Sequence, residues 1–392
     1  MFYITVFNDF EKIIRSDIMN SSKNKTCFIL NYAPHYRKQI FIKLSEELDC
    51  DIFCGDTLKL KLKKIDFDKL DFKIKELKTI WFFKRLAWMK GQLSLLFDDK
   101  YKSFVLTGQP YFISDTLFIL CCFFTSKKVY LWNHSPKNNV SNFKFWYYKI
   151  LLSLIDGFFL YSNYDKNILI NKFKTNTNKL HVIFNSLDYE FHKSIRNEVI
   201  DEEFYKNKNF FTNPNLPIVV FIGRLESIKK IERLIEAIIS LKERNYLINL
   251  LIIGDGSQME FLKGKASGFN DQIYFYGNSY DEFENGQMLA NTDLCVSPGN
   301  VGLTAIHALS FGTPVCTHDN FEKQMPEVEA IIEGQTGIFF NYNQDNLVET
   351  IINWFNSQPT RSIIRENCYK IIDSYYNPNF QVEVFKKELE KH

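Results

Sequence analysis

The sequence predicts an α/β protein with two doubly wound, Rossmann-like domains that face each other across a cleft. Its 392 residues exceed the size at which one hydrophobic core stops growing, so two domains are expected. Strand-like apolar runs alternate with amphipathic helical patterns, which is typical of parallel sheets covered by helices. A polar segment, Asn197–Pro217, separates two such series and ends in NPNLP, which favours a linker.

The order of the expected elements gives the domain boundaries. Strands in the first half are expected at Thr26–Leu30, Asp51–Cys54, Ser103–Leu106, Lys128–Leu131, Gly157–Tyr161 and Leu180–Ile183. Strands in the second half are expected at Ile218–Ile222, Leu250–Ile253, Ile273–Phe275, Leu294–Ser297 and Pro314–Thr317. We assign residues 1–195 to the first domain, 196–376 to the second, and 377–392 to a last amphipathic helix that packs towards the first domain.

Charge is divided unequally between the halves. Residues 1–200 carry 31 Lys and Arg against 20 Asp and Glu, whereas residues 201–392 carry 17 against 26. A basic first half suggests an anionic surface or ligand. Nucleic acid is not expected, because the sequence has no zinc knuckle, basic helical arm or RNP-like strand. The eight cysteines lack metal-site spacing and indicate reduced thiols of a cytoplasmic protein, so no metal is assigned.

A membrane-spanning segment is not expected. The longest apolar run, around Leu117–Phe124, is shorter than the roughly 20 residues that a bilayer requires. Asp9 and Glu11 interrupt the apolar start, which excludes a signal peptide. Residues 59–97 combine the run KLKLKK with aromatic and leucine residues beside Lys84, Arg85 and Lys90. This pattern is typical of an interfacial helix on anionic lipid, and equally of a core helix with a solvated basic face. The positive charge together with the aromatic residues favours the helix that contacts a membrane.

Two stretches of the second half have the composition of an anion site. In Val219–Lys230, VVFIGRLESIKK, a buried strand ends at Gly223, and Arg224 and Lys229 follow where a helix starts. Helix N-termini disfavour cations, so these two side chains call for a compensating anion such as a diphosphate. In Ser297–Val315, SPGNVGLTAIHALSFGTPV, glycines allow a close backbone approach before a helix whose N–H groups point at the ligand.

The order of these motifs resembles a known family. GRLxxxKK is followed by LLIIGDG, IYFYGN, TDLCVSP, the glycine-rich turn, GTPV and EVEAIIEGQTG. This order is similar to that of the nucleotide-sugar-binding half of retaining glycosyltransferases of family 4, which have the GT-B fold and include bacterial capsule and O-antigen enzymes. The resemblance is strong over residues 217–340. It is weaker at NYAPHYR (31–37), YLWNH (130–134) and LHVIFNSLD (180–188).

The resemblance implies a role for each matching position. Arg224 and Lys229, with Gly223 before them, would hold the donor diphosphate. Gly277 and Asn278 would contact the base. His134 would reach the donor sugar and the reacting oxygen. The phosphate and the donor sugar would be held by Gly299, Asn300, Val301, Gly302, Leu303 and Thr304.

Two positions depart from the family pattern. The family has one glutamate in the loop, which holds sugar hydroxyls, and one in the helix, which binds the ribose; here these positions are Gly299 and His307. Backbone N–H groups and Asn300 would then hold the sugar. His307 is either a ribose ligand or a partly buried helix histidine. Glu327 or Glu329 resembles a donor-site glutamate, and Thr317–Gln324 supplies either cleft residues or a turn cap.

These features predict a retaining, metal-independent glycosyltransferase without a cofactor. The donor would be a nucleotide diphosphate sugar, with UDP favoured over GDP. The acceptor would be a glycan or a polyprenyl-diphosphate-linked glycan of a surface polysaccharide, reached from the cytoplasmic face of the membrane. The alternatives are a nucleotide-sugar-binding pseudoenzyme, suggested by the missing glutamates, and a GT-B-fold sugar epimerase.

Overall fold

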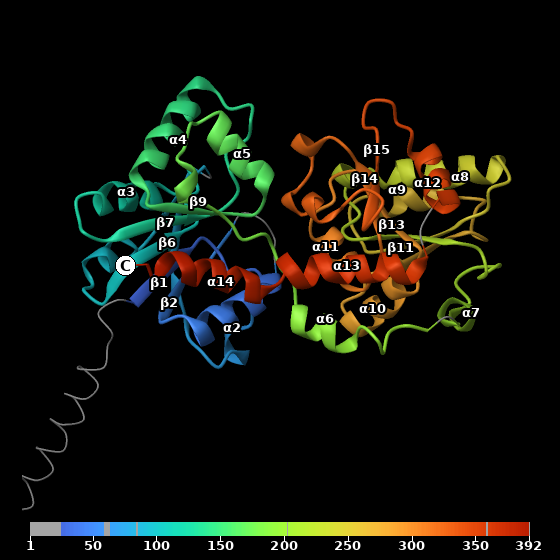
Figure 1. Ribbon diagram of the computed structural model, residues 1–392, viewed down its shortest axis with the longest axis horizontal. Coiled ribbons are helices and arrows are strands. Elements are labelled where there is room, and N and C mark those ends of the chain that lie inside the picture. Colours follow the sequence, from blue (N-terminus) through green and yellow to red (C-terminus); the bar gives the residue numbers. More distant parts are fainter. Residues whose placement is uncertain (1–24, 59–62, 84, 202, 358–359, 392) are drawn as a thin grey trace, which may run out of the picture. The chain divides into compact units, whose positions relative to one another are not determined.

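The computed structural model describes residues 25–58, 63–83, 85–201, 203–357 and 360–391. These residues form two compact units (Figure 1). Unit 1 contains the chain up to Leu160, Asp165–Val182 and the residues from Val382 onward. Unit 2 contains Tyr161–Tyr164 and Ile183–Gln381. The units therefore divide at residue 183, before the boundary that the sequence suggested after residue 195.

Unit 1 is built on a seven-stranded parallel sheet in the order β3-β2-β1-β6-β7-β8-β9. Its strands are β1 (Lys25–Leu30), β2 (Cys50–Gly55), β3 (Ile74–Leu77), β6 (Tyr101–Leu106), β7 (Lys128–Trp132), β8 (Gly157–Leu160) and β9 (Leu180–Val182). Helices α3 (Ile113–Cys122), α4 (Asn142–Leu154) and α5 (Asn163–Asn171) cover one face, and α2 (Lys38–Glu47) covers the other (Figure 1).

The last helix, α14 (Pro378–Leu389), completes unit 1. Its buried Phe385 lies against Phe28, Trp132 and Phe159, with ring centroids 5.5, 5.0 and 4.3 Å away. These three aromatic residues come from β1, β7 and β8, so the helix packs on the central strands. The predicted return of the C-terminal helix to the first domain is present in the fold.

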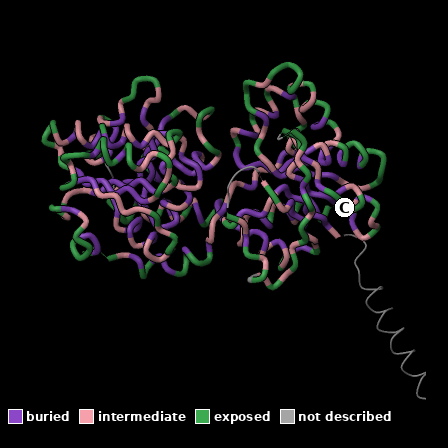
Figure 2. The backbone as a smooth tube through the Cα atoms, turned by 180° about the vertical axis from the view of Figure 1, so that it is seen from behind, coloured by how far each residue is buried: buried purple, intermediate pink, exposed green. Residues whose placement is uncertain are grey.

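Unit 2 is built on a six-stranded parallel sheet in the order β12-β11-β10-β13-β14-β15. Its strands are β10 (Ile218–Ile222), β11 (Asn249–Ile253), β12 (Ile273–Gly277), β13 (Leu294–Ser297), β14 (Val315–His318) and β15 (Gly337–Phe340). Its helices are α6 (Tyr189–Ile195), α7 (Phe204–Lys208), α8 (Ile231–Glu243), α9 (Met259–Lys265), α10 (Glu282–Ala290), α11 (Leu303–Ser310), α12 (Leu347–Ser357) and α13 (Arg361–Tyr375). Buried strands form the centre of each unit, and exposed loops surround them (Figure 2).

Asn197–Pro217 is part of unit 2 and not a linker. Val199, Phe204 and Phe211 are buried in the core of this unit. The Tyr205 hydroxyl donates to the Met288 carbonyl oxygen at 2.6 Å. The abundance of Asn and acidic residues concealed these apolar anchors, so the prediction of a linker was wrong.

Residues 79–97 do not form the predicted helix. Strands β4 (Thr79–Phe82) and β5 (Leu86–Met89) pair as an antiparallel hairpin. Thr79, Ala87 and Met89 are buried while Ile80 and Leu86 face outward, which is the period of a strand. The turn contains Phe83 at a positive φ of 48° and no glycine, so the usual turn signal was missing. Lys84 and residues 59–62 of the predicted basic segment lie outside the described residues.

None of the helices in the described ranges has both the length and the apolar character that crossing a bilayer requires.

Candidate functional site

The candidate site of unit 2 lies where the winding of the sheet reverses. Strand β10 pairs with β11 on one side and with β13 on the other, although β13 comes three strands later in the chain. Connections after β10 and after β13 therefore leave in opposite directions, and doubly wound sheets bind ligands beyond the carboxyl ends of the strands at such a point. The β10 loop (residues 223–230) and the glycine loop (residues 298–302) border this position.

The two loops contact each other through their backbones. The Gly299 N–H donates to the Lys229 carbonyl oxygen at 2.9 Å, and the Lys229 ammonium donates to the Asn300 carbonyl oxygen at 2.7 Å. A Cβ atom at position 299 would lie 2.1 Å from the Ile228 carbonyl oxygen and 2.7 Å from Lys229 Cα. Only glycine fits at this position, so the glutamate of the family pattern has no room in this loop arrangement.

Residues beyond β14 fix the shape of the glycine loop. The Val301 N–H donates to Gln324 Oε1 at 2.7 Å, and Gln324 Nε2 donates to the Thr317 hydroxyl at 2.8 Å. That hydroxyl donates in turn to the Ser297 carbonyl oxygen at 2.8 Å. Part of the Thr317–Gln324 run therefore supports the loop, a role that its position after a strand did not specify.

Helix α11 begins directly after the glycine loop, as predicted. Gly302 precedes its first residue, Leu303, and the Thr304 hydroxyl donates to the Ile222 carbonyl oxygen at 3.0 Å. This bond ties the helix to the end of β10. The first N–H groups of a helix have no acceptor within the helix, and they carry the positive end of its dipole. The turn is therefore suited to an anion.

Lys229 and Arg224 bring positive charge to the same position. Burial lowers the pKa of Lys229 to about 8; nearby Glu327 opposes this change and Arg224 adds to it. Arg224 is exposed, and in the described part of the chain it forms no ion pair. A partly dehydrated ammonium beside an exposed guanidinium attracts a multiply charged anion, which would restore the ordinary pKa of the lysine.

The two glutamates that the sequence left unresolved have different environments. Glu329 accepts the N–H groups of Asn163 and Tyr164 at 2.8 and 2.6 Å, so it anchors that segment within unit 2. Glu327 is 2% exposed and accepts Asn185 Nδ2 at 2.8 Å through Oε1. Within the described ranges its Oε2 atom has no hydrogen-bond partner. In the described residues, Glu327 is therefore the glutamate of the pair that keeps a buried oxygen without a hydrogen-bond partner.

Gly277 and Asn278, predicted to contact the base, lie at the end of the edge strand β12: Gly277 is its last residue and Asn278 follows it. Gly277 adopts a φ of +85°, and its carbonyl oxygen accepts the Gly254 N–H at 2.7 Å. Asn278 is exposed and lies 3.4 Å from the hydroxyl of Tyr280. The Tyr280 side chain is 80% exposed, so it offers an aromatic face that the sequence did not single out.

His307 makes close contacts within the protein. Its Nε2 atom lies 3.0 Å from Glu282 Oε2, and the same oxygen lies 3.1 Å from Nε2 of buried His192. Burial raises the pKa of Glu282, but its contacts with the two histidines outweigh this and hold the pKa well below its usual value. His192 and Glu282 had no recognisable motif in the sequence, because they come from helices α6 and α10.

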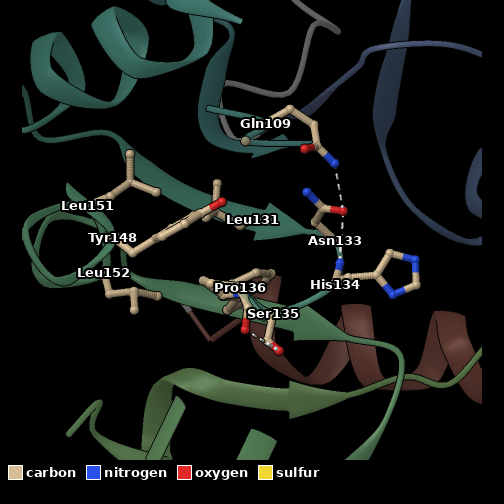
Figure 3. A pocket seen from close by; sticks show the side chains of 11 residues that line it. Gln109, Leu131, Asn133, His134, Ser135, Pro136, Tyr148, Leu151 and Leu152 are labelled. Atoms are coloured by element: carbon tan, nitrogen blue, oxygen red, sulfur yellow. Dashed lines mark hydrogen bonds between the residues drawn. The ribbon is translucent and has the colours of Figure 1, made fainter. Parts of the chain in front are cut away.

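His134 is the one predicted site residue in unit 1. It follows β7 and lines a pocket of about 130 Å³ with Gln109, Asn133 and Tyr148. The imidazole points away from the apolar part of this pocket (Figure 3). It is 44% exposed, and its Nδ1 atom lies 3.8 Å from Asp165 Oδ2. Asn133 Oδ1 accepts the backbone N–H of His134 at 2.8 Å, which fixes the backbone at this turn.

Comparison with known proteins identifies the C-terminal half. Residues 201–371 match the family described as "Glycosyl transferases group 1". A GDP-mannose-dependent alpha-(1-6)-phosphatidylinositol dimannoside mannosyltransferase of Mycobacterium tuberculosis is 31% identical over 110 residues. The aligned region is 27% of this chain and 28% of that relative, so the chain spans less than a third of the curated relative's length.

Solved structures are similar over nearly the whole chain. A glycosyltransferase from Rickettsia africae has a TM-score of 0.71 at 17% identity, over 94% of this chain and 100% of that one. HepE from Anabaena, solved in complex with UDP, has a TM-score of 0.65 at 14% identity, over 94% and 100%. At these identities the likeness establishes the fold. The chain therefore has the GT-B fold, and its residues 201–371 match the family of group 1 glycosyl transferases.

Proposed function

We propose that this protein transfers a sugar, with retention of configuration, from a nucleotide diphosphate sugar to a glycan acceptor. The observation that carries the proposal is the partly buried ammonium of Lys229, which is near Arg224 and donates a hydrogen bond to the glycine loop that precedes α11. The group 1 family of residues 201–371 supports the same activity. The reaction described below does not require the carboxylate that the glycine loop lacks, because the leaving phosphate would take the proton of the acceptor hydroxyl.

The reaction would proceed by breaking the bond between the anomeric carbon and the leaving phosphate. Negative charge grows on that phosphate, and Arg224, Lys229 and the first N–H groups of α11 would stabilise it. The leaving phosphate oxygen would take the proton of the acceptor hydroxyl while that hydroxyl oxygen bonds the anomeric carbon on the same face. This scheme needs no divalent cation on the diphosphate. His134 is proposed as a further residue that contacts the donor sugar.

The donor is proposed to be a UDP-sugar, with a GDP-sugar as the second option. UDP is bound in the related HepE structure, whereas the mycobacterial relative is named for GDP-mannose. Tyr280 would stack on the base beside Gly277 and Asn278. Two polar atoms without partners in the described residues, Asn300 Oδ1 and Glu327 Oε2, are proposed to bind sugar hydroxyls in place of the missing loop glutamate.

The acceptor is proposed to be a polyprenyl-diphosphate-linked glycan, reached by peripheral contact of unit 1 with an anionic membrane. Exposed aromatic side chains of unit 1 support this contact. They lie on the β4–β5 hairpin, at the end of the short 3₁₀ helix Leu93–Phe97, just after α3, and on α4. We call the following residues the aromatic surface: Phe83, Phe97, Phe124, Phe143 and Trp146, which are 59–93% exposed. Exposed Arg85, Lys90 and Lys144 add positive charge.

Ligand-induced stabilisation tests the donor. The full chain is heated with UDP, GDP, dTDP and their sugars, each at a range of concentrations. A ligand at 100 times its dissociation constant adds about 2.7 kcal/mol to the free energy of unfolding, so the true donor gives a clear rise in melting temperature. A flat response to the whole panel would contradict the nucleotide-sugar proposal. Stabilisation by GDP compounds alone would mean that the donor nucleotide is GDP and not UDP.

Transfer is tested with Arg224→Ala and Lys229→Ala. Each variant should lower the transfer rate about 100-fold or more, the scale of losing one donor to a developing negative charge. The matched control is Lys265→Ala, an exposed lysine of the same unit that pairs with Glu236 at 2.8 Å. Near-normal transfer in both test variants would refute the diphosphate assignment.

Donor binding without transfer to any acceptor or water would favour a pseudoenzyme, and a product with an inverted ring carbon would favour an epimerase.

A further inference from the structure

Three side chains from three helices of unit 2 meet outside the residues proposed to hold the diphosphate. His192 comes from α6, Glu282 from the first turn of α10, and His307 from α11. The nearest ligand atoms of the three residues lie within 4.8 Å of one another. One carboxylate oxygen, Glu282 Oε2, is 3.1 Å from His192 Nε2 and 3.0 Å from His307 Nε2.

Two of the three distances between ligand atoms match the requirements of a small transition-metal ion. A tetrahedral Zn²⁺ ion binds histidine nitrogen and carboxylate oxygen at about 2.0–2.2 Å, which places neighbouring ligand atoms about 3.3 Å apart. The two oxygen–nitrogen distances are within a few tenths of an ångström of that value. Two imidazoles and one carboxylate are also a ligand set that Zn²⁺ accepts while keeping a fourth position for water.

In the part of the chain that the structure describes, hydrogen bonding within the cluster joins His192 Nε2 to Glu282 Oε2 at 3.1 Å and leaves one nitrogen of each histidine unsatisfied. Among the described residues, buried His192 Nδ1 and His307 Nε2 have no hydrogen-bond partner. His307 Nε2 is close to Glu282 Oε2 yet is not aligned with it for a hydrogen bond. A buried nitrogen beside a carboxylate, without a proton shared between them, is a ready ligand for a cation.

The cluster is open to solvent on the side of the carboxylate. The Glu282 side chain is 42% exposed while those of His192 and His307 are 2% and 14% exposed. An ion can therefore enter from solvent past the carboxylate and hold a water molecule on that side.

We propose that His192 Nε2, Glu282 Oε2 and His307 Nε2 form a binding site for one divalent transition-metal ion of the Zn²⁺ class. The ion would link α6, α10 and α11. Because α11 begins at the glycine loop, the link would hold that helix in place without touching the proposed diphosphate-binding residues. The site does not depend on the proposed transferase activity.

The site is tested on the untagged full-length chain after removal of metals with a chelator. Cys121→Ser is used as the background, because Cys121 is an exposed thiol that could bind Zn²⁺ independently. Titration with ZnCl₂ should show one ion bound per chain by calorimetry and by elemental analysis after dialysis. Co²⁺ in place of Zn²⁺ should give the visible absorption of a tetrahedral complex.

Variants of the ligands distinguish the site from adventitious binding. Glu282→Gln and His307→Ala should each weaken Zn²⁺ binding by at least about 10-fold, the loss typical even for residues that only orient metal ligands. His192→Ala should act likewise, but His192 is buried, so its result counts only if the melting temperature of the metal-free variant is unchanged. The matched control is Glu284→Gln, on the same helix and outside the cluster. Binding that is absent in the parent protein, or equal in the parent and in Glu282→Gln, would overturn the proposal.

Discussion

Lys229 illustrates what a sequence indicates about a residue and what it omits. Two cations after a buried strand suggested an anion site, because helix N-termini disfavour positive charge. Burial lowers the pKa of Lys229, and its partners Asn300 and Glu327 lie far away in the chain. The roles of Glu327 and Glu329 likewise could not be distinguished by spacing. Glu327 accepts a hydrogen bond from Asn185 and Glu329 accepts one from Asn163, and both partners are distant in the sequence.

The pKa of Lys229 predicts how donor affinity depends on pH. A diphosphate binds the protonated lysine better, so the affinity for the nucleoside diphosphate should be constant below about pH 8 and fall above it. Lys229→Arg should remove this decline, because the guanidinium stays charged. The measurement is a calorimetric titration between pH 6.5 and about 9.5, where arginine remains protonated. An identical decline in Lys229→Arg would mean that another group titrates.

The same pKa has a consequence for stability. The folded value, about 8, lies below the ordinary value of 10.5, so the unfolded chain binds more protons between these pH values. The contribution of Lys229 to the free energy of unfolding should therefore rise with pH across this window. Comparison of denaturant unfolding curves for the parent and Lys229→Met at pH 7.5 and about 10 measures this difference.

At the scale of elements, most strands of the two sheets were predictable, whereas two edge strands and the irregular parts were not. The runs expected as sheet strands all coincide with strands, because a buried parallel strand is a short continuous apolar run. The edge strands β3 and β15 were not expected, and both are partly exposed. The hairpin at residues 79–89 was misread because its turn lacks glycine. The glycine loop was recognised, but its contact with Ile228 joins residues about 70 positions apart and depends on how β10 and β13 pair.

That contact predicts the cost of a side chain at position 299. Gly299→Ala should lower the free energy of unfolding by about 1–3 kcal/mol, since a Cβ atom would lie 2.1 Å from the Ile228 carbonyl oxygen. Gly299→Glu should cost at least as much and should not improve donor binding, although it restores the residue of the family pattern. The control is Gly264→Ala in α9, where the added Cβ meets nothing within 4 Å and should be neutral or stabilising. Chemical denaturation measures all three, and an unaltered Gly299→Ala variant would contradict the geometry.

At the scale of the whole molecule, composition indicated two domains and an uneven charge but not which surface carries function. Aromatic abundance could be attributed equally to the core and to a membrane contact. In the structure, Phe118 and Phe159 are buried, whereas Phe124 and Phe143 are exposed. Exposure depends on the packing of α3 and α4, so counting residue types could not separate these groups.

The aromatic surface predicts binding to lipid vesicles. The full chain should sediment with vesicles that contain anionic lipid, and binding should weaken as salt increases. Phe143→Ser with Trp146→Ser should reduce binding by at least about 10-fold, since each buried aromatic side chain contributes roughly 1.5–3 kcal/mol. Phe261→Ser is the control, because Phe261 is a half-exposed phenylalanine of unit 2. Equal sedimentation of the double variant and the control would remove this surface as the membrane contact.

The backbone contact between residue 299 and residues 228–229 also limits how this protein can change by evolution or engineering. A related enzyme with a glutamate in the glycine loop must carry a β10 loop that leaves room for it. Substitutions in the two loops must therefore occur together, although about 70 residues separate the loops in the sequence. A chimaera that imports the glycine loop alone from such a relative should fail to fold correctly, whereas one that imports both loops can acquire the donor preference of its source.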